Sequence, residues 1–391
     1  MSDTVLNYKE TVKCPHPFNS LYYDMTDKVG PCCLNPLMKA IPVSDYLGSE
    51  KLVNIKNSML QEVKPTGFCT DRCYKYEEMN FGTQRQGAIH EYQDTTIYDT
   101  TKIQHIEVRF TSLCNSKCRI CNSSISSAIA GEEKAHGLYS GPILSYAGPT
   151  EDFVLNEIKQ YTDDLQVVTF SGGEPMLQWQ HWEFLDHLIE NGKSPKLYYY
   201  SNGSVVTYKG THITEKWKHF DRILYRVSLD VSGTAADYWR PGTGSDWNTI
   251  VENIRSVRST LDNVDIQYII TLAWPTLFRI GELLEELEKI NVGPYDFAFN
   301  AMWEPRFSIQ TLPLEYKQKA KEYINSVAIL NSNEKYNFHK RNAILSYLDG
   351  DDESYRMPAA IQHLKDVDQR RNQSFVDTFP EYAELAREYG Y

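Results

Sequence analysis

The sequence predicts an α/β protein whose central part is a partial (β/α)6 barrel of the TIM type. Between residues 103 and 300, short apolar runs alternate with amphipathic segments, a pattern typical of parallel strands joined by right-handed helical crossovers. All eight cysteines lie within the first 121 of the 391 residues. This uneven distribution indicates a separate cysteine-rich module at the N-terminus, while the rest of the chain builds the scaffold.

Six apolar runs are expected to form the strands of the barrel. They span residues 103–110, 165–170, 196–200, 223–229, 265–272 and 295–300. Segments between them have apolar residues at helical spacing and are expected to form helices, notably at 178–191, 246–261 and 277–290. Six strand–helix units are too few for a closed eightfold barrel. We therefore expect an open one, with functional residues on the loops that follow the strands.

The two ends of the chain differ from this central part. We expect residues 1–95 to form an irregular cysteine-rich module with two helical stretches, near 49–63 and from Tyr74 towards Tyr92. Residues 96–312 would form the barrel. Residues 313–391 are polar with a helical pattern and would form a C-terminal helical extension. Within the third barrel strand, the run Tyr198–Tyr200 is expected to serve packing.

The composition is that of a soluble globular protein, with 41% hydrophobic and 24% charged residues. The formal net charge of −12 gives no general attraction for nucleic acid and so disfavours that partner. No apolar run approaches the roughly 20 residues that span a bilayer. The first 14 residues also lack the apolar core of a secretory signal. We expect a cytoplasmic protein with no membrane partner, in a compartment where thiols stay reduced.

Three cysteines stand close together in the segment TSLCNSKCRICNSS, directly after the first predicted strand. Cys114, Cys118 and Cys121 have the spacing C-x3-C-x2-C. Three thiolates can hold three irons of a cubane iron–sulfur cluster and leave the fourth iron open for chemistry. The alternatives are a structural zinc site or three buried cysteines, although zinc sites usually add a second cysteine pair or histidines.

Small and polar residues follow the next three predicted strands. Two glycines in SGGEP would let the backbone approach a ligand closely, although Gly-Gly is also an ordinary turn. SNG follows the third strand, and SLD and RPG follow the fourth, where an arginine fork would suit a carboxylate. Serines and aspartate at these positions would serve equally well as turn residues. The candidate ligand-binding residues are Gly172, Gly173, Glu174, Pro175, Ser201, Asn202, Ser228, Asp230 and Arg240.

The cysteine triad and these segments, in this order, resemble the radical S-adenosylmethionine (SAM) enzyme family over about residues 103–300. The resemblance implies that Cys114, Cys118 and Cys121 hold a [4Fe–4S] cluster whose open iron binds SAM. In the family, the segment matching GGEP contacts the SAM amino group, and SNG is similar to the family's TNG turn. Polar residues after the fourth strand commonly contact the SAM ribose and carboxylate. The implied reaction is reductive cleavage of SAM to a 5′-deoxyadenosyl radical, which abstracts hydrogen from a substrate. An electron donor such as flavodoxin or ferredoxin is expected.

The other five cysteines lie in the pattern CPHPF…VGPCC…GFCTDRC. This pattern resembles the auxiliary-cluster module called a twitch domain, which is related to the larger SPASM domain. The family's Pro-Cys matches Pro31-Cys32, so Cys33 would be the spare. The implied ligands of a second [4Fe–4S] cluster are Cys14, Cys32, Cys69 and Cys73. Zinc is the alternative. In many relatives this module follows the barrel, whereas here it precedes it.

The resemblance indicates a substrate class only broadly. Twitch and SPASM relatives often modify peptides, so peptide or protein modification is the first expectation. Only 13 residues precede Cys14, so no leader-peptide-binding domain is expected there, and this weakens the peptide prediction. The alternatives are a small carbohydrate, a nucleoside or an RNA substrate. A non-catalytic iron–sulfur protein that transfers electrons or binds a partner is the alternative from another class.

Overall fold

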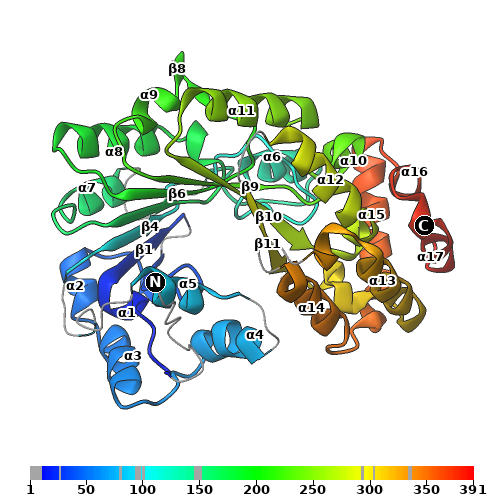
Figure 1. The fold of residues 1–391 in the computed structure, drawn as a ribbon, viewed down its shortest axis with the longest axis horizontal. Coiled ribbons are helices and arrows are strands. Elements are labelled where there is room, and N and C mark those ends of the chain that lie inside the picture. The colour runs from blue at the N-terminus through cyan, green and yellow to red at the C-terminus, as the bar shows by residue number, and fades with distance from the viewer. Residues whose placement is uncertain are drawn as a thin grey trace.

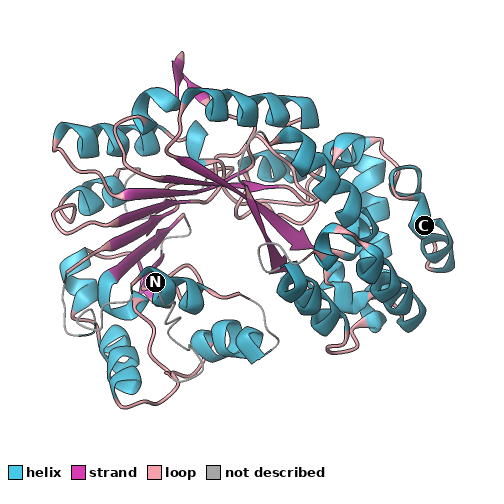
Figure 2. Ribbon diagram, viewed as in Figure 1, coloured by secondary structure: helices cyan, strands magenta, loops and turns pink. Residues whose placement is uncertain are grey.

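The computed structural model describes residues 11–25, 28–78, 82–92, 98, 102–144, 152–291, 295–302, 304–332 and 337–391. Its centre is a nine-stranded sheet with the strand order β11-β10-β9-β6-β5-β4-β1-β2-β3 (Figures 1 and 2). These strands are β1 (Ser20–Asp24), β2 (Lys28–Gly30), β3 (Met38–Lys39), β4 (His105–Val108), β5 (Val167–Phe170), β6 (Lys196–Ser201), β9 (Ile223–Ser228), β10 (Val264–Leu272) and β11 (Asp296–Ala301). A separate small hairpin joins β7 (Thr207–Tyr208) to β8 (Thr211–His212).

The six strands predicted for the barrel are all present, as β4, β5, β6, β9, β10 and β11. Each pairs in parallel with the next one along the chain. This arrangement makes an α/β fold with a mostly parallel sheet, consistent with the expected open barrel. Parallel neighbours need crossovers, and helices supply them: α6 (Ser127–Ala135), α7 (Phe153–Lys159), α8 (Trp179–Glu190), α9 (Thr214–Trp217), α10 (Gly233–Trp239), α11 (Trp247–Thr260) and α12 (Ile280–Ile290). In Figure 1, α8 and α11 lie along one face of the sheet.

The helical prediction at 277–290 shows why these crossovers form where they do. The structure has α12 there, preceded by a short 3-10 helix at Trp274–Arg279. Its apolar side chains recur every three or four residues and all face the core, whereas its charged residues face outward. The buried residues of α12 are Ile280, Leu283, Leu284, Leu287 and Ile290.

The prediction that residues 1–95 are irregular apart from two helices is wrong in one important respect. β1 is buried along its whole length and pairs in parallel with β4, with Leu21 opposite Ile106 and Tyr23 opposite Val108. β2 and β3 then extend the sheet with antiparallel pairing. The sheet therefore continues from the cysteine-rich segment into the barrel, and the predicted boundary at residues 95 and 96 lies outside the described part of the chain.

Short helices make up much of the remaining N-terminal segment. They are α1 (His16–Asn19), α2 (Val43–Leu47), α3 (Glu50–Leu60), α4 (Lys75–Glu78) and α5 (Gln84–Glu91). α3 is the first helix predicted here. The second predicted stretch, from Tyr74 towards Tyr92, contains two separate helices, α4 and α5, and a capping box at Thr83 starts α5.

Beyond the barrel, the described chain is mainly helical. The helices are α13 (Leu314–Ser326), α14 (Asn337–Leu348), α15 (Met357–Arg371), α16 (Phe375–Thr378) and α17 (Ala383–Glu388). Figure 1 shows them grouped at the β11 side of the sheet, away from the N-terminal helices. None of the helices in the described ranges combines the length and the apolar character needed to cross a membrane.

Candidate functional site

Cys114, Cys118 and Cys121 lie on the loop that follows β4. Cys118 is buried and the other two are partly buried. Burial raises the pKa of all three thiols, to about 12 for Cys114, and the neighbouring Cys118 raises the pKa of Cys114 and Cys121 further. The three thiols are thus close enough to interact electrostatically. Such thiols favour the protonated form until a positive charge, such as that of a metal group, is brought to them.

Two glycines from different segments of the chain, Gly173 and Gly242, pack against the backbone of this cysteine loop. A Cβ atom on Gly173 would stand 2.2 Å from the carbonyl oxygen of Leu113, and one on Gly242 would stand 2.4 Å from that of Asn115. The close approach allows hydrogen bonds from the Glu174 N–H to Leu113 (2.7 Å) and from the Thr243 N–H to Asn115 (3.1 Å). Only glycine leaves room for backbones this close, so both glycines position the loop that carries the triad.

The Glu174 carboxylate is completely buried at the end of the same loop system. It accepts hydrogen bonds from the Ser201 hydroxyl (2.9 Å) and from the backbone N–H groups of Asn202 (2.8 Å) and Met176 (3.3 Å). Burial outweighs these bonds and raises its pKa from 4.5 to about 7. Glu174 therefore ties the segment after β5 to the end of β6.

The side chain of Asn202 continues this connection to the cysteine loop. Its amide nitrogen donates to Asn115 Oδ1 and to Ser116 Oγ, both at 2.9 Å. The Asn115 amide in turn donates to Ser204 Oγ (2.9 Å) and to the Thr243 carbonyl (2.8 Å). The segments after β5, β6 and β9 thus meet around the first cysteines of the triad, as predicted for loops at the carboxyl ends of parallel strands. Asn115 and Ser116 were not predicted as participants.

Asp230 and Arg240 form a buried ion pair with an N···O distance of 2.8 Å. Asp230 also accepts from Trp239 Nε1 (3.1 Å) and from the Thr271 N–H (2.8 Å). Arg240 Nη1 lies 3.7 Å from Cys118 Sγ. Burial alone lowers the pKa of Arg240, but Asp230 and the Cys118 thiol raise it by more. The guanidinium is therefore held charged beside the triad.

The remaining predicted ligand-binding residues lie along the same edge of the sheet. Gly172 has a φ angle of +118°, which favours glycine. A Cβ atom added there would stand 3.2 Å from the Cβ atom of Arg109. Pro175 is buried and begins a short 3-10 helix. Ser228 is the last residue of β9 and is partly exposed.

A second contact network joins the cysteine loop to the C-terminal helices. Arg119, between Cys118 and Cys121, is buried with its guanidinium 3.7 Å from the ring centroid of Tyr238. Its Nη2 donates to Asp368 Oδ1 of α15 at 2.6 Å. Sequence reasoning did not find this pair, because nothing local indicates a partner 249 positions away.

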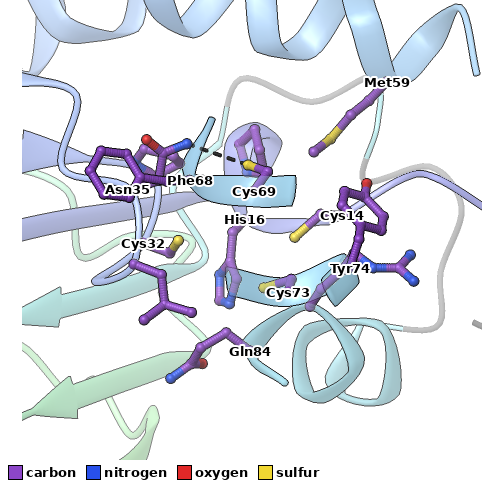
Figure 3. Close-up of a pocket in the computed structure, with 14 residues that line it drawn as sticks. Cys14, His16, Cys32, Asn35, Met59, Phe68, Cys69, Cys73, Tyr74 and Gln84 are labelled. Atoms are coloured by element: carbon purple, nitrogen blue, oxygen red, sulfur yellow. Dashed lines mark hydrogen bonds between the residues drawn. The ribbon is translucent and has the colours of Figure 1, made fainter. Parts of the chain in front are cut away.

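Four of the five N-terminal cysteines line one cavity, shown in Figure 3. The sulfur atoms of Cys14, Cys32, Cys69 and Cys73 turn toward the space between them. Asn35 Nδ2 donates to Cys69 Sγ at 3.4 Å. Burial raises the pKa of all four thiols, to about 11 for Cys73.

Cys33 differs from these four cysteines. It is not among the residues that line the cavity. Instead it lies near the Glu107 carboxylate, and the Gln84 side-chain nitrogen is 3.7 Å from its sulfur. Among the described residues, neither cysteine group is arranged as three or more side chains that could hold a metal ion. The four N-terminal thiols therefore lie around one cavity, but their sulfur atoms do not converge on a single point as the ligands of one metal ion would.

A cavity of about 620 Å³ lies on the inner face of the barrel. It begins at the first residues of several strands, and His16 and Gln84 line both this cavity and the cysteine cavity. Polar side chains from five strands face it: His105 and Glu107 of β4, Thr169 of β5, Tyr198 and Tyr200 of β6, Arg226 of β9 and Gln267 of β10.

This barrel cavity was not predicted, because functional residues were expected only on loops. The sequence did contain a signal for it. Strands of a parallel sheet that is covered on both faces are expected to be apolar throughout, whereas these strands carry a polar residue at every second position. The packing role predicted for the tyrosine run holds for Tyr199, which is fully buried. Tyr198 also packs, against the cluster of Ala88, Tyr92 and Val167. Tyr198 and Tyr200 in addition line the cavity, which was not predicted.

Residues 108–273 match the family model described as the radical SAM superfamily. This part of the chain is similar to the radical SAM superfamily. The matched range begins at the last residue of β4 and contains the cysteine triad, Glu174, Asp230 and Arg240. The superfamily implies a [4Fe–4S] cluster and SAM as the cofactors of this domain. The second cysteine group lies outside the matched range.

Several solved structures resemble part of this chain at low identity. Native anSMEcpe with bound AdoMet is 14% identical with a TM-score of 0.40, covering 57% of this chain and 59% of that chain. Streptococcus suis SuiB bound to S-adenosylmethionine is 11% identical with a TM-score of 0.38, covering 72% and 59%. TYW1 with a lysine-pyruvate adduct bound is 13% identical with a TM-score of 0.30, covering 55% and 70%.

The match thus spans about three fifths of the length of the first two of these proteins. None of the curated proteins matches this sequence significantly. At these identities and TM-scores, the solved structures carry no inference about the substrate of this chain.

The buried Glu174 carboxyl should make the stability of the folded protein depend on pH. Because its pKa is about 7 in the folded protein and about 4.3 when unfolded, the folded state holds more protons between these values. Stability should therefore fall by roughly 3 kcal/mol as pH rises from about 4.5 to 7, and by a further few tenths of a kcal/mol before it levels off at about pH 8. We expect Glu174→Gln to remove this part of the pH dependence. Urea unfolding at several pH values compares the two proteins, and equal pH profiles would contradict the assignment.

Proposed function

We propose that the protein is a radical SAM enzyme that cleaves SAM at a [4Fe–4S] cluster held by Cys114, Cys118 and Cys121. The supporting observation is that the radical SAM match contains the loop with these cysteines, packed between Gly173 and Gly242. The cluster and SAM, when bound, supply the one-electron chemistry that yields a 5′-deoxyadenosyl radical and abstracts hydrogen from a substrate. The chain's own task is to hold these groups in place.

Arg240 is the residue of this site best suited to a SAM carboxylate. Its guanidinium is buried, charged and next to Cys118, and Asp230 fixes its direction from one side. An arginine fork can donate two parallel hydrogen bonds to a carboxylate. Asp230, Glu174 and Ser201 already use their polar atoms within the protein. We therefore assign these three residues to positioning, with the Gly172–Gly173 backbone next to the ligand. The Asn202 side chain is likewise bonded within the protein, so we assign it to positioning as well.

A second [4Fe–4S] cluster in the N-terminal segment is part of the same proposal. Four thiols that surround one cavity suit a cubane with four cysteine ligands. Zinc would require the ligand sulfurs to converge at about 2.3 Å from one ion. The cavity wall also contains apolar side chains, including Met59 and Phe68, which would limit water access to a bound cluster. This module precedes the barrel and shares His16 and Gln84 with the barrel cavity.

Two adjacent cysteines provide a matched test of this second site. We expect Cys32→Ala to lower the iron content of the anaerobically reconstituted protein by up to about four per chain, because one of four ligands is lost. Cys33→Ala removes the neighbouring thiol and should leave the iron content unchanged. Iron and sulfide analysis of both variants measures the difference. Equal losses in the two variants, or none in Cys32→Ala, would show that the ligand set is wrong.

For the substrate, we propose a peptide or small molecule whose reacting part enters the barrel cavity. The volume of about 620 Å³ lies within the roughly 300–1,000 Å³ typical of ligand pockets. Peptide or protein modification is the first candidate. A flavodoxin or ferredoxin would supply the electron, and a reducing cytoplasm would keep the seven ligand cysteines from forming disulfides.

The proposed function is tested by SAM cleavage. The protein is reconstituted without oxygen with iron and sulfide, mixed with SAM and a strong reductant, and analysed by chromatography for 5′-deoxyadenosine and methionine. We expect both products in protein that holds about eight irons per chain. Protein with about eight irons and no 5′-deoxyadenosine would refute the enzyme and leave an iron–sulfur protein of another kind.

A further inference from the structure

Two arginines, Arg222 and Arg226, line the barrel cavity. Arg226 lies on β9, and its Nε donates to Gln267 Oε1 of β10 at 3.0 Å. Its guanidinium lies 5.1 Å from the ring centroid of Tyr198 and 4.9 Å from that of Tyr200. Neutral groups from two neighbouring strands therefore orient this charged group, and cation–π contacts of this kind hold an arginine without consuming its hydrogen-bond donors.

The other charged residues that line the cavity have partners of opposite charge. The ion pairs are Arg222–Asp265 (2.9 Å), Glu91–Lys196 (2.5 Å), Asp296–Lys340 (2.8 Å) and Glu107–Arg109 (3.8 Å). Within the described residues, Arg226 forms no such ion pair. Glu107 is near enough for Arg226 to lower its pKa somewhat, but burial raises the pKa of Glu107 overall. Among the described residues that line the cavity, Arg226 is thus the one charged side chain without an ion-pair partner.

A buried nitrogen in the cavity wall is a second, independent observation. His105 lines the cavity and is more than nine-tenths buried, with Nε2 hydrogen-bonded to Thr169 Oγ1 at 2.9 Å. Its Nδ1 is buried and has no partner among the described residues. Buried polar atoms are nearly always hydrogen-bonded, so this unpartnered nitrogen in the cavity wall is compatible with a polar partner from the cavity.

We propose that the barrel cavity binds its ligand through an oxyanion, a carboxylate or a phosphate, held by Arg226 between Tyr198 and Tyr200. The two terminal nitrogens of the guanidinium present a planar fork that matches either group. Because the aromatic rings shield the guanidinium from water on its sides, the interaction is stronger than at an open surface. The inference rests on the proposed function only in treating this ligand as the substrate.

Calorimetric titration of the reconstituted protein without reductant tests this site. Three probes are used: glutarate, its neutral diamide glutaramide, and inorganic phosphate. We expect at least one anion to bind and the diamide not to bind, and the preferred anion tells a carboxylate ligand from a phosphate ligand. Arg226→Gln should weaken binding of that anion at least about tenfold, which corresponds to about 1.4 kcal/mol. Arg226→Lys, which keeps the charge but loses the fork, should be intermediate.

The matched control is Arg255→Gln, the same change at an exposed position of α11, which should bind as the unmodified protein does. The site is refuted if neither anion binds, if the diamide binds equally well, or if Arg226→Gln retains full affinity. Should Arg226→Gln fail to fold, Arg226→Lys decides, and full affinity in that variant refutes the role of the fork. Since no SAM is cleaved in this experiment, its failure is distinct from failure of the proposed function.

Discussion

Replacing Cys114, Cys118 and Cys121 together by alanine is expected to abolish 5′-deoxyadenosine formation. The variant should retain about four of about eight irons per chain, because the N-terminal thiols line a separate cavity and share no ligand with the triad. Chromatography of the SAM cleavage products and iron analysis of the same preparation measure both effects. This is the largest expected change in activity, since the loss of the ligands removes the cluster itself.

The outcome separates the two cysteine groups. Cys33→Ala serves as the control, because it removes a partly buried thiol that belongs to neither proposed ligand set. SAM cleavage that persists in the triple variant would assign the reaction to the N-terminal group. Loss of all iron from the triple variant would indicate that the two sites do not assemble independently.

Gly173→Ala is expected to have the largest structural effect of any single added methyl group at the triad. The new Cβ would stand 2.2 Å from the Leu113 carbonyl oxygen and 2.7 Å from its carbon, both backbone atoms that cannot turn away. The cysteine loop must then move from the segment after β5. We expect a loss of about 1–3 kcal/mol in the free energy of unfolding and a loss of about four irons from the triad.

Gly131→Ala is the matched control for this variant. Gly131 lies within α6, and nothing comes within 4 Å of a Cβ atom placed there. Alanine in a helix interior should stabilise the protein by roughly 0.5–1 kcal/mol. Urea unfolding and iron analysis compare the two variants. If Gly173→Ala keeps its stability and full iron content, the loop is not held by this close approach.

The barrel strands and crossover helices were predictable because their periodicity is local. An amphipathic segment such as 277–290 carries its own pattern of buried positions, and the structure places α12 there. β1 was missed because its short run, SLYYD, lies among cysteines and pairs with β4, about 80 residues later in the chain. Parallel pairing over such a distance leaves no local sign.

The candidate site was likewise predictable only where the sequence pattern is local. The sequence placed the triad, the GGEP segment and Arg240 on loops that meet in space, because carboxyl ends of parallel strands share one edge. It did not show that the carboxylate oxygens of Glu174 and Asp230 accept hydrogen bonds from other groups of the protein, since hydrogen-bond partners depend on packing. The pair Arg119–Asp368 and the position of Arg226 between two tyrosines likewise depend on tertiary contacts.

The central claim is that the triad holds the cluster that binds SAM. It is tested most directly in the variant with Cys14, Cys32, Cys69 and Cys73 all replaced by alanine, where only the triad can hold a cluster. After anaerobic reconstitution and reduction, its electron paramagnetic resonance spectrum is recorded with and without SAM. We predict the signal of one reduced [4Fe–4S] cluster, at about four irons per chain, that changes on addition of SAM. A cluster signal that is identical with and without SAM would contradict the account.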